Sequence, residues 1–323
     1  MSAAPAWHPD PYRNARIALQ QGDTAPALHL LGAARGDAEA RIHALDTLSR
    51  SSALHRLPQL EAQLATEPSN ADLLLLVGAL QQQAAWDARG AAYISHTSAD
   101  QINGLMRHMV RARTSLRRVT ELLPDDPAPW YELMGCAMAA QDYHNEPHDM
   151  WNELVRRGGD VSYAATRLRM TTLTAKWHGS REECFAFARE RTRNLTPGHP
   201  LYALIPLVHI EEYVSQRSDD KVLTRVRAVF RYFSRRPVRE EIEAASDALM
   251  AAADTFATHT ASPAAHQAFG YVFDDRGDLK RARRHLERSG DEAIWPWLYF
   301  GDDDWDLFDK ARMRADLPRL PRP

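Results

Sequence analysis

Apolar side chains recur at three- and four-residue steps along most of this chain, which is the spacing of an amphipathic helix. Over residues 279–286, Leu279, Ala282 and Leu286 follow this spacing with charged residues between them. Residues 111–123 repeat the pattern. No stretch alternates apolar and polar residues over the length of a strand, so the sequence predicts an all-α fold.

The ends of the predicted helices carry recognisable capping residues. Asn70 precedes the apolar run that begins at Leu73, and its side chain can accept a hydrogen bond from a free N–H group of the first turn. Ser180 and Glu183 have the spacing of a capping box, in which the two residues satisfy each other's backbone donors. We therefore expect helices to begin just after Asn70 and Ser180.

A self-similar pattern is the most informative feature of the sequence. Along residues 266–289 the chain has His266, Phe269-Gly270, Phe273, a turn at Gly277-Asp278-Leu279, and then Ala282, Leu286 and Ser289. This pattern resembles the tetratricopeptide repeat, in which a small residue lets two helices cross closely and large residues fill the gaps on either side. The resemblance implies a stack of helical hairpins that binds a partner.

Looser copies of the pattern predict a tetratricopeptide-like helical-hairpin solenoid that forms a single α-helical repeat domain over residues 1–323. Its repeat-like units are expected at about residues 9–35, 70–124, 127–158, 160–197 and 262–290, followed by a C-terminal capping segment at 291–323. The second unit is longer than one repeat, which predicts an insertion at 86–107.

Four segments resemble those of a bacterial, largely actinobacterial, family of unknown function. They are Trp86 to Gly90, the stretch from Arg111 to Trp130 with its Leu123-Pro-Asp-Asp-Pro127, Lys176 to Ser180, and Trp297 to Gly301. The likeness covers roughly residues 60–310. It implies a bacterial cytoplasmic helical-repeat protein and carries no assigned chemistry.

Charge and targeting signals narrow the class of partner. The chain has 40 basic and 43 acidic side chains, which disfavours a general nucleic-acid binder because such proteins neutralise phosphates with clustered Lys and Arg. The longest apolar run, Leu73 to Leu80, is too short to span a bilayer, and the N-terminus lacks the basic start and apolar run of a signal peptide. Cys136 and Cys184 both lie in apolar helical patterns that favour reduced thiols. We expect a cytoplasmic protein with no membrane insertion.

In a tetratricopeptide stack the first helix of each hairpin lines the concave face. The positions expected to form this partner-binding groove are Leu75, Ala79, Gln82 and Gln83, then Tyr131, Gly135 and Met138, and then Gln267, Tyr271 and Asp274. The Lys and Asn residues that hold a terminal carboxylate in chaperone-binding members are absent from these positions. A neutral groove of Tyr, Gln and Met indicates an extended or helical peptide as the partner.

Two further regions are candidates for binding. The insertion carries Trp86, Arg89 and Tyr93, and long insertions in compact domains are often functional. Basic side chains gather at Arg225–Arg239 and Lys280–Arg288, opposite an acidic stretch that begins at Asp302. These basic helices are interpreted as solvated outer faces, with recognition of an acidic partner or pairing with the acidic stretch as the alternative.

Candidate catalytic or metal chemistry is sparse. His144 and His148 are four residues apart, but Pro147 lies between them, which favours a turn leading into a helix over a zinc site. His209 with Glu211 and Glu212 is interpreted as a buried or surface-paired histidine. We predict no catalytic residue, no bound metal and no cofactor. The leading hypothesis is a protein–protein interaction scaffold or adaptor, and the alternative is a metal-dependent or accessory enzyme that uses His144 and His148, or His209 and Glu212.

Overall fold

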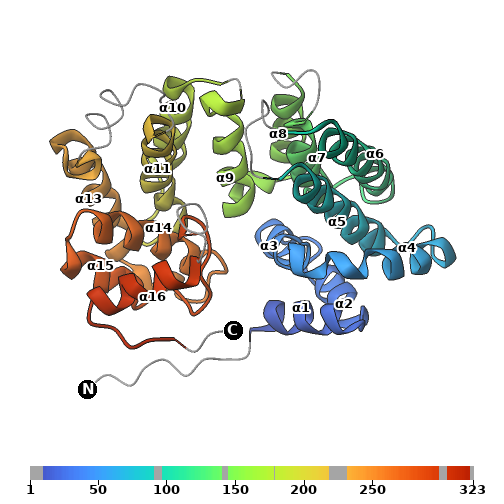
Figure 1. The fold of residues 1–323 in the computed structure, drawn as a ribbon, viewed down its shortest axis with the longest axis horizontal. Coiled ribbons are helices and arrows are strands. Elements are labelled where there is room, and N and C mark those ends of the chain that lie inside the picture. The colour runs from blue at the N-terminus through green and yellow to red at the C-terminus, as the bar shows by residue number, and fades with distance from the viewer. Residues whose placement is uncertain are drawn as a thin grey trace. The chain divides into compact units, whose positions relative to one another are not determined.

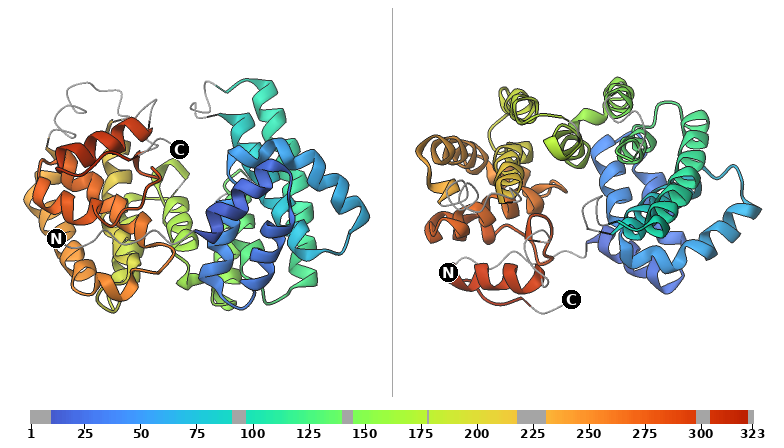
Figure 2. Two further views of the ribbon diagram at one scale, coloured as in Figure 1. Left: turned by 90° about the horizontal axis from the view of Figure 1, so that it is seen from below. Right: turned by 45° about the horizontal axis from the view of Figure 1, so that its top comes forward.

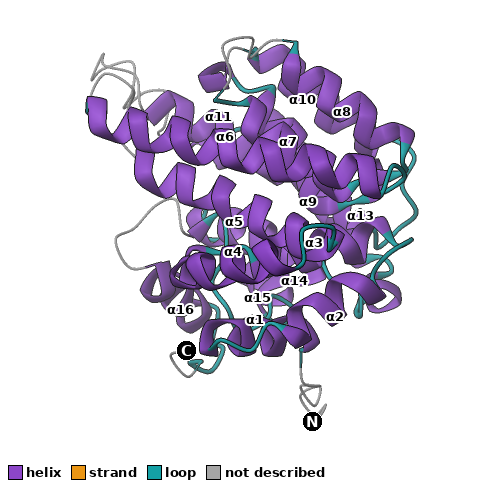
Figure 3. Cartoon of the chain, turned by 90° about the vertical axis from the view of Figure 1, so that its right-hand side faces the viewer, coloured by secondary structure: helices purple, strands orange, loops and turns teal. Residues whose placement is uncertain are grey.

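The structure is a computed structural model that describes residues 10–90, 97–139, 145–177, 179–217, 231–297 and 304–320. Over these residues it consists of helices and helical turns and contains no strand (Figure 3). The all-α prediction is therefore confirmed. None of the described helices is both long and apolar enough to cross a lipid bilayer.

Contacts between residues divide the chain into two compact units, residues 1–172 and 173–323. The elements of the first unit, whose α-helices are labelled in Figure 1, are α1 (Pro11–Gln21), α2 (Ala25–Ala33), α3 (Ala38–Leu48), η1 (Ser51–Arg56), α4 (Leu57–Thr66), α5 (Ala71–Arg89), α6 (Ala99–Leu122), α7 (Ala128–Ala137), α8 (Glu146–Arg156), η3 (Gly159–Val161) and α9 (Tyr163–Thr172).

The elements of the second unit are η4 (Ala175–Trp177), α10 (Arg181–Thr192), η5 (Pro200–Ala203), α11 (Leu204–Arg217), η6 (Tyr232–Ser234), α13 (Arg236–Met250), η7 (Ala253–Phe256), α14 (Ser262–Asp275), α15 (Leu279–Leu286) and α16 (Asp304–Arg314). Helix α16 packs on α14 and α15, so it covers the end of that hairpin as a capping segment would.

Hairpins form where the repeat pattern is clearest, and the reason is close helix crossing. In α5 and α6, a Cβ on Gly78 would lie 2.8 Å from the side chain of Leu116. In α14 and α15, a Cβ on Gly270 would lie 2.7 Å from Leu286. Glycine is therefore required at both crossings, which is the role that the sequence pattern predicts for a small residue. Helices α1 with α2 and α7 with α8 also pack against each other.

The insertion predicted at 86–107 lengthens a hairpin. Helix α5 continues to Arg89, and α6 begins after a capping box in which Ser98 and Gln101 satisfy each other's backbone donors. These two long helices lie side by side, as the blue-green pair in Figure 2 shows. Residues 91–96, which include Tyr93, lie outside the described residues.

The segment predicted as a repeat unit at 160–197 contains α9 and α10. Helix α9 packs on α3 and α7, where Glu39 accepts a hydrogen bond from the backbone N–H of Tyr163 at 2.8 Å, and α10 packs on α11. The boundary between the two compact units falls inside this segment, between Thr172 and Leu173.

Two helix starts follow the prediction. Asn70 Oδ1 accepts a hydrogen bond from the backbone N–H of Leu73 at 3.1 Å. Ser180 Oγ accepts one from the backbone N–H of Glu183 at 3.1 Å, and this hydroxyl also donates to the Glu183 carboxylate. Both side chains therefore cap their helices, although the Glu183 carboxylate bonds the hydroxyl and not the backbone of Ser180.

Candidate functional site

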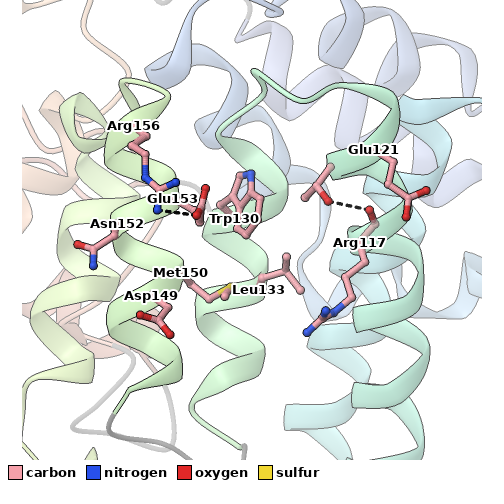
Figure 4. A pocket seen from close by; sticks show the side chains of 10 residues that line it. Arg117, Glu121, Trp130, Leu133, Asp149, Met150, Asn152, Glu153 and Arg156 are labelled. Atoms are coloured by element: carbon pink, nitrogen blue, oxygen red, sulfur yellow. Dashed lines mark hydrogen bonds and ion pairs between the residues drawn. The ribbon is translucent and has the colours of Figure 1, made fainter.

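A groove of about 480 Å³ runs between α6 and α8 over the side of α7 (Figure 4). We call it the α6–α8 groove. Arg117, Thr120 and Glu121 line it from α6, Trp130 and Leu133 from α7, and Asp149, Met150, Asn152, Glu153 and Arg156 from α8. Its volume is in the range of typical ligand sites, and its floor is apolar while its walls are charged.

Local sequence explains why two large side chains of α7 form the floor. Asp126 Oδ1 accepts a hydrogen bond from the backbone N–H of Ala128 at 3.0 Å, so α7 begins at once after the Asp-Asp-Pro turn. Trp130 and Leu133 then lie three residues apart on one face of the helix. Helix α8 buries Trp151 and Leu154 among other side chains, and its neighbouring positions face the groove.

Trp130 is held by a charged neighbour. The guanidinium of Arg157 lies 4.6 Å from the centre of the indole ring, which is a cation–π contact. Arg157 is itself oriented by the Glu153 carboxylate, to which Nη1 donates at 2.7 Å. The indole Nε1 of Trp130 is buried and has no hydrogen-bond partner in the described structure. Arg157 therefore positions the Trp130 ring at the floor of the groove.

A second hollow of about 330 Å³ borders the same turn. It is lined by residues 35–38 and Arg41, by residues 123–127, and by Arg157. Residues 123–130, which the sequence analysis singles out as Leu-Pro-Asp-Asp-Pro-Ala-Pro-Trp, thus contribute to both hollows. Arg41 is buried in this region and binds Asp126, so the turn is anchored to α3.

Of the groove positions predicted in the first unit, those at 75, 82 and 83 lie on α5, and Tyr131 lies on α7 with Met138 directly after it; none of them lines the α6–α8 groove. Leu75 and Tyr131 are buried, and the Tyr131 hydroxyl donates to Asp46 Oδ1 at 2.8 Å. Gln82 contacts Gly135 of α7. Gln83 donates hydrogen bonds to Ser51 of η1 and to Asp87. The two glutamines therefore join α5 to α7 and η1. Met138 is partly exposed and does not line the α6–α8 groove.

The groove positions predicted in the second unit are interior. Gln267 is 1% exposed, and its amide nitrogen donates to the backbone carbonyls of Ser289 and Glu292. Tyr271 is buried against Trp297, with ring centres 5.3 Å apart. Both side chains hold α14 to the segment that follows α15. Asp274 is paired with Arg314.

The residues proposed in the insertion have local roles. Trp86 and Arg89 are partly exposed in the last turns of α5. Arg89 Nη1 donates to the backbone carbonyl of Gly90 at 3.1 Å, and the Arg89 carbonyl accepts from Gln101 of α6. These contacts close the described end of the long hairpin.

The histidines proposed for metal binding have other partners. His144 lies outside the described residues, and His148 Nδ1 lies 3.0 Å from Arg169 Nη2. His209 is buried between the Tyr232 hydroxyl and the Glu241 carboxylate, at 3.0 and 3.1 Å. Glu212 accepts from Gln216 and Arg181 instead, and Glu211 pairs with Lys176. The described residues contain no group of three or more His, Cys, Asp or Glu side chains placed to hold a metal.

Of the two basic regions, residues 280–288 are described in full and residues 225–239 from Arg231 onward, where Arg236 pairs with Glu240. In the former region, Arg281 and Arg283 of α15 and Arg288 just after it pair with Asp247, Asp316 and Asp254. These basic side chains therefore contribute to ion pairs within the second unit. Residues 218–230 and 298–303, which hold Arg225 and Asp302, lie outside the described residues.

Both cysteine thiols are free and buried. Burial raises the pKa of Cys184 to about 12 and raises that of Cys136 further. Neither thiol is therefore poised as a nucleophile, because only the thiolate reacts.

Glu132 of α7 is an acid that the sequence analysis did not single out. It is 3% exposed, and its carboxyl group has no hydrogen bond or ion pair within the described residues. Burial, and then the nearby charge of Asp46, raise its pKa to about 8. The available sequence signal was a glutamate between Tyr131 and Leu133, inside an otherwise apolar stretch. An uncompensated buried acid lowers stability at neutral pH.

Replacing Glu132 with glutamine is expected to stabilise the first unit at pH 7 by an amount on the order of 3 kcal/mol. The pKa is 4.5 ordinarily and about 8 in the folded chain, so over this range the unfolded chain loses a proton that the folded chain keeps. The contribution of the Glu132 carboxyl group to the free energy of unfolding is therefore fully present below about pH 4.5 and is lost as the pH rises toward 8. Urea unfolding at pH 5 and at pH 8 measures the difference.

Glu121→Gln is the matched control, since the Glu121 side chain is 64% exposed. It is expected to change the urea midpoint little at either pH. A Glu132→Gln variant with the same pH dependence as the wild type would contradict the interpretation.

No family model, curated protein or solved structure matches the chain. The geometry of the α6–α8 groove therefore carries the functional argument.

Proposed function

We propose that this chain is a tetratricopeptide-like scaffold that binds a protein partner, and that the α6–α8 groove is the contact site of its first unit. The observation that carries the proposal is the apolar floor of Trp130 and Leu133, open between two charged helical walls. A buried aromatic anchor surrounded by polar side chains is the arrangement typical of protein-binding hot spots.

The repeat character is supported by equivalent packing in two hairpins. Gly78 against Leu116 and Gly270 against Leu286 are related in the same way, and in each second helix an alanine four residues before the leucine, Ala112 or Ala282, is fully buried. Helical hairpins of this kind bury their remaining apolar faces by stacking on one another. We place the contact site on the side of Trp130 and not on the predicted side of Tyr131, because Tyr131 is buried.

We further propose that the protein is bacterial and cytoplasmic and that it belongs with the largely actinobacterial family that its sequence resembles. The segment at 123–130, which carries part of that resemblance, borders the groove. Two free, buried thiols agree with a reducing compartment.

Site-specific photocrosslinking in cells tests the contact site. A photoreactive amino acid is placed at Met150, which lines the groove, or at Val155, which is 39% exposed on the same helix but outside the groove. We expect a discrete crosslinked protein from position 150 and none from position 155. Identical products from both positions, or none from position 150, would overturn the proposal.

A further inference from the structure

The two walls of the α6–α8 groove carry opposite charges that are free. Arg117 stands on the α6 wall and Asp149 on the α8 wall, with Leu133 and Met150 between them (Figure 4). Both charged side chains are exposed. Neither has an ion-pair or hydrogen-bond partner within the parts of the chain that the structure describes. A ligand in the groove therefore meets a cation on one side and an anion on the other.

Other charged groups of the lining are already neutralised. Glu121 accepts from Arg118 at 2.6 Å, and Glu153 from Arg156 at 2.6 Å. Since paired charges are largely compensated, Arg117 and Asp149 are the groups that set the electrostatic preference of the groove.

We infer that the groove takes an amphipathic helix of a protein partner, with one apolar row against Trp130 and Leu133, an acidic row beside Arg117 and a basic row beside Asp149. This inference rests on the proposed function. A depression between two helices, with a floor of side chains three residues apart, accepts the side-chain ridge of a third helix. Free charges of opposite sign on the two walls select a helix that carries both signs.

Three synthetic peptides of about 20 residues, longer than the roughly 12 to 15 residues below which an isolated helix is marginal in water, provide the test. They share one row of leucines at helical spacing. The two flanking rows are Glu and Lys in the first peptide, Glu and Glu in the second, and Lys and Lys in the third. Wild-type protein is expected to bind the mixed peptide at least about fivefold more tightly than either single-sign peptide, as measured by fluorescence anisotropy.

Charge variants of the protein sharpen the test. Arg117→Glu makes both walls acidic and is expected to shift the preference to the Lys-Lys peptide. Asp149→Lys makes both walls basic and is expected to shift it to the Glu-Glu peptide. The double variant exchanges the two signs and is expected to recover the mixed peptide, which then binds in the opposite direction.

Arg107→Glu is the matched control, because Arg107 is exposed on α6 but does not line the groove. It is expected to leave the peptide preference unchanged. Circular dichroism and urea midpoints establish that each variant folds.

Equal binding of all three peptides, no binding of any, or single variants that keep the wild-type preference would overturn the inference. The proposed function has an independent readout, because photocrosslinking at position 150 detects a protein partner of any charge. Crosslinking at position 150 without charge-selective peptide binding would therefore reject the amphipathic helix and retain the partner-binding groove.

Discussion

Replacing Arg41 with methionine is expected to lower the free energy of unfolding of the first unit by about 3 to 5 kcal/mol. The Arg41 side chain is 1% exposed, and its Nε and Nη2 both donate to Asp126 Oδ2, at 3.0 and 2.7 Å. Its Nη1 lies 2.8 Å from Asp72 Oδ1 and 2.6 Å from the Leu31 carbonyl oxygen. One guanidinium thus joins α2, α3, α5 and the turn before α7.

The physical reason for this large loss is the pair of carboxylates left behind. The side chains of Asp72 and Asp126 are 11% and 7% exposed, so water cannot replace the lost cation well. Asp72 keeps Arg35 as a partner, whereas Asp126 has no other ion pair within the described residues. The turn before α7, which positions Trp130, is therefore expected to loosen first.

Urea unfolding measures the loss, and hydrogen exchange on peptides from residues 123–137 locates it. Asp126→Asn in the Arg41→Met background is expected to restore at least about 1 kcal/mol, because it removes the unpaired charge. Arg41→Lys keeps the positive charge but lacks the forked geometry of the guanidinium. Its free energy of unfolding is expected to lie between those of the wild type and Arg41→Met. A loss below about 1 kcal/mol for Arg41→Met would contradict the network.

Acidification from pH 7 to pH 5 is expected to destabilise the second unit by about 2 kcal/mol for each of His266 and His285. Their Nδ1 atoms are 2.9 Å apart, and His285 Nε2 lies 2.9 Å from Ser246 Oγ. Both residues are buried, and Phe269 stacks on His285 with ring centres 4.8 Å apart. The interior therefore accepts neutral imidazoles and excludes imidazolium.

The direction of this stability change follows from the pKa values of the two histidines. Burial, and then the charge of Arg288, lower the pKa of His266 to about 3. Burial, and then the neighbouring His266, lower that of His285 well below its ordinary 6.5. As the pH falls below 6.5 the unfolded chain gains protons that the folded chain does not. Stability from these groups is thus complete above about pH 6.5 and is lost as the pH falls toward 3.

Urea midpoints between pH 7 and pH 5 test this expectation. The double variant His266→Leu and His285→Phe has no imidazole at either position, and we expect it to lose most of the acid sensitivity of the second unit, whatever its stability at pH 7. His29→Asn is the control, since His29 is exposed in the first unit. Unchanged acid sensitivity in the double variant would refute the assignment to this pair.

Much of the fold was predictable because it depends on local spacing. Apolar residues at helical steps place α5, α6, α14 and α15, and the glycines at 78 and 270 mark where their helices cross. Asn70 and Ser180 mark helix starts by their own short-range hydrogen bonds. The packing of α9 and α10 in different compact units was not predictable, because the spacing of apolar residues does not show which neighbours bury two adjacent amphipathic helices.

For the candidate site, the sequence predicted a partner-binding groove between helices but not the residues that line it. Transfer of repeat positions onto α7 selected Tyr131 and Met138, whereas the open groove is floored by Trp130 and Leu133, a different face of the same helix. Burial of Tyr131 depends on Asp46 of α3, a residue 85 positions away in the chain. The spacing of apolar residues shows that α7 packs on more than one side. It does not show which side the neighbouring helices leave exposed.

By itself, the sequence determined that this protein is helical, that helices begin after Asn70 and Ser180, and where two helix pairs cross closely, since each depends on residues a few positions apart. The tertiary structure decided the rest. It brought Arg41 to Asp126, His266 to His285 and Arg117 opposite Asp149, from separate elements. Burial and charge pairing are properties of such assembled neighbours, so the charged groove between α6 and α8 appears only once the helices are packed.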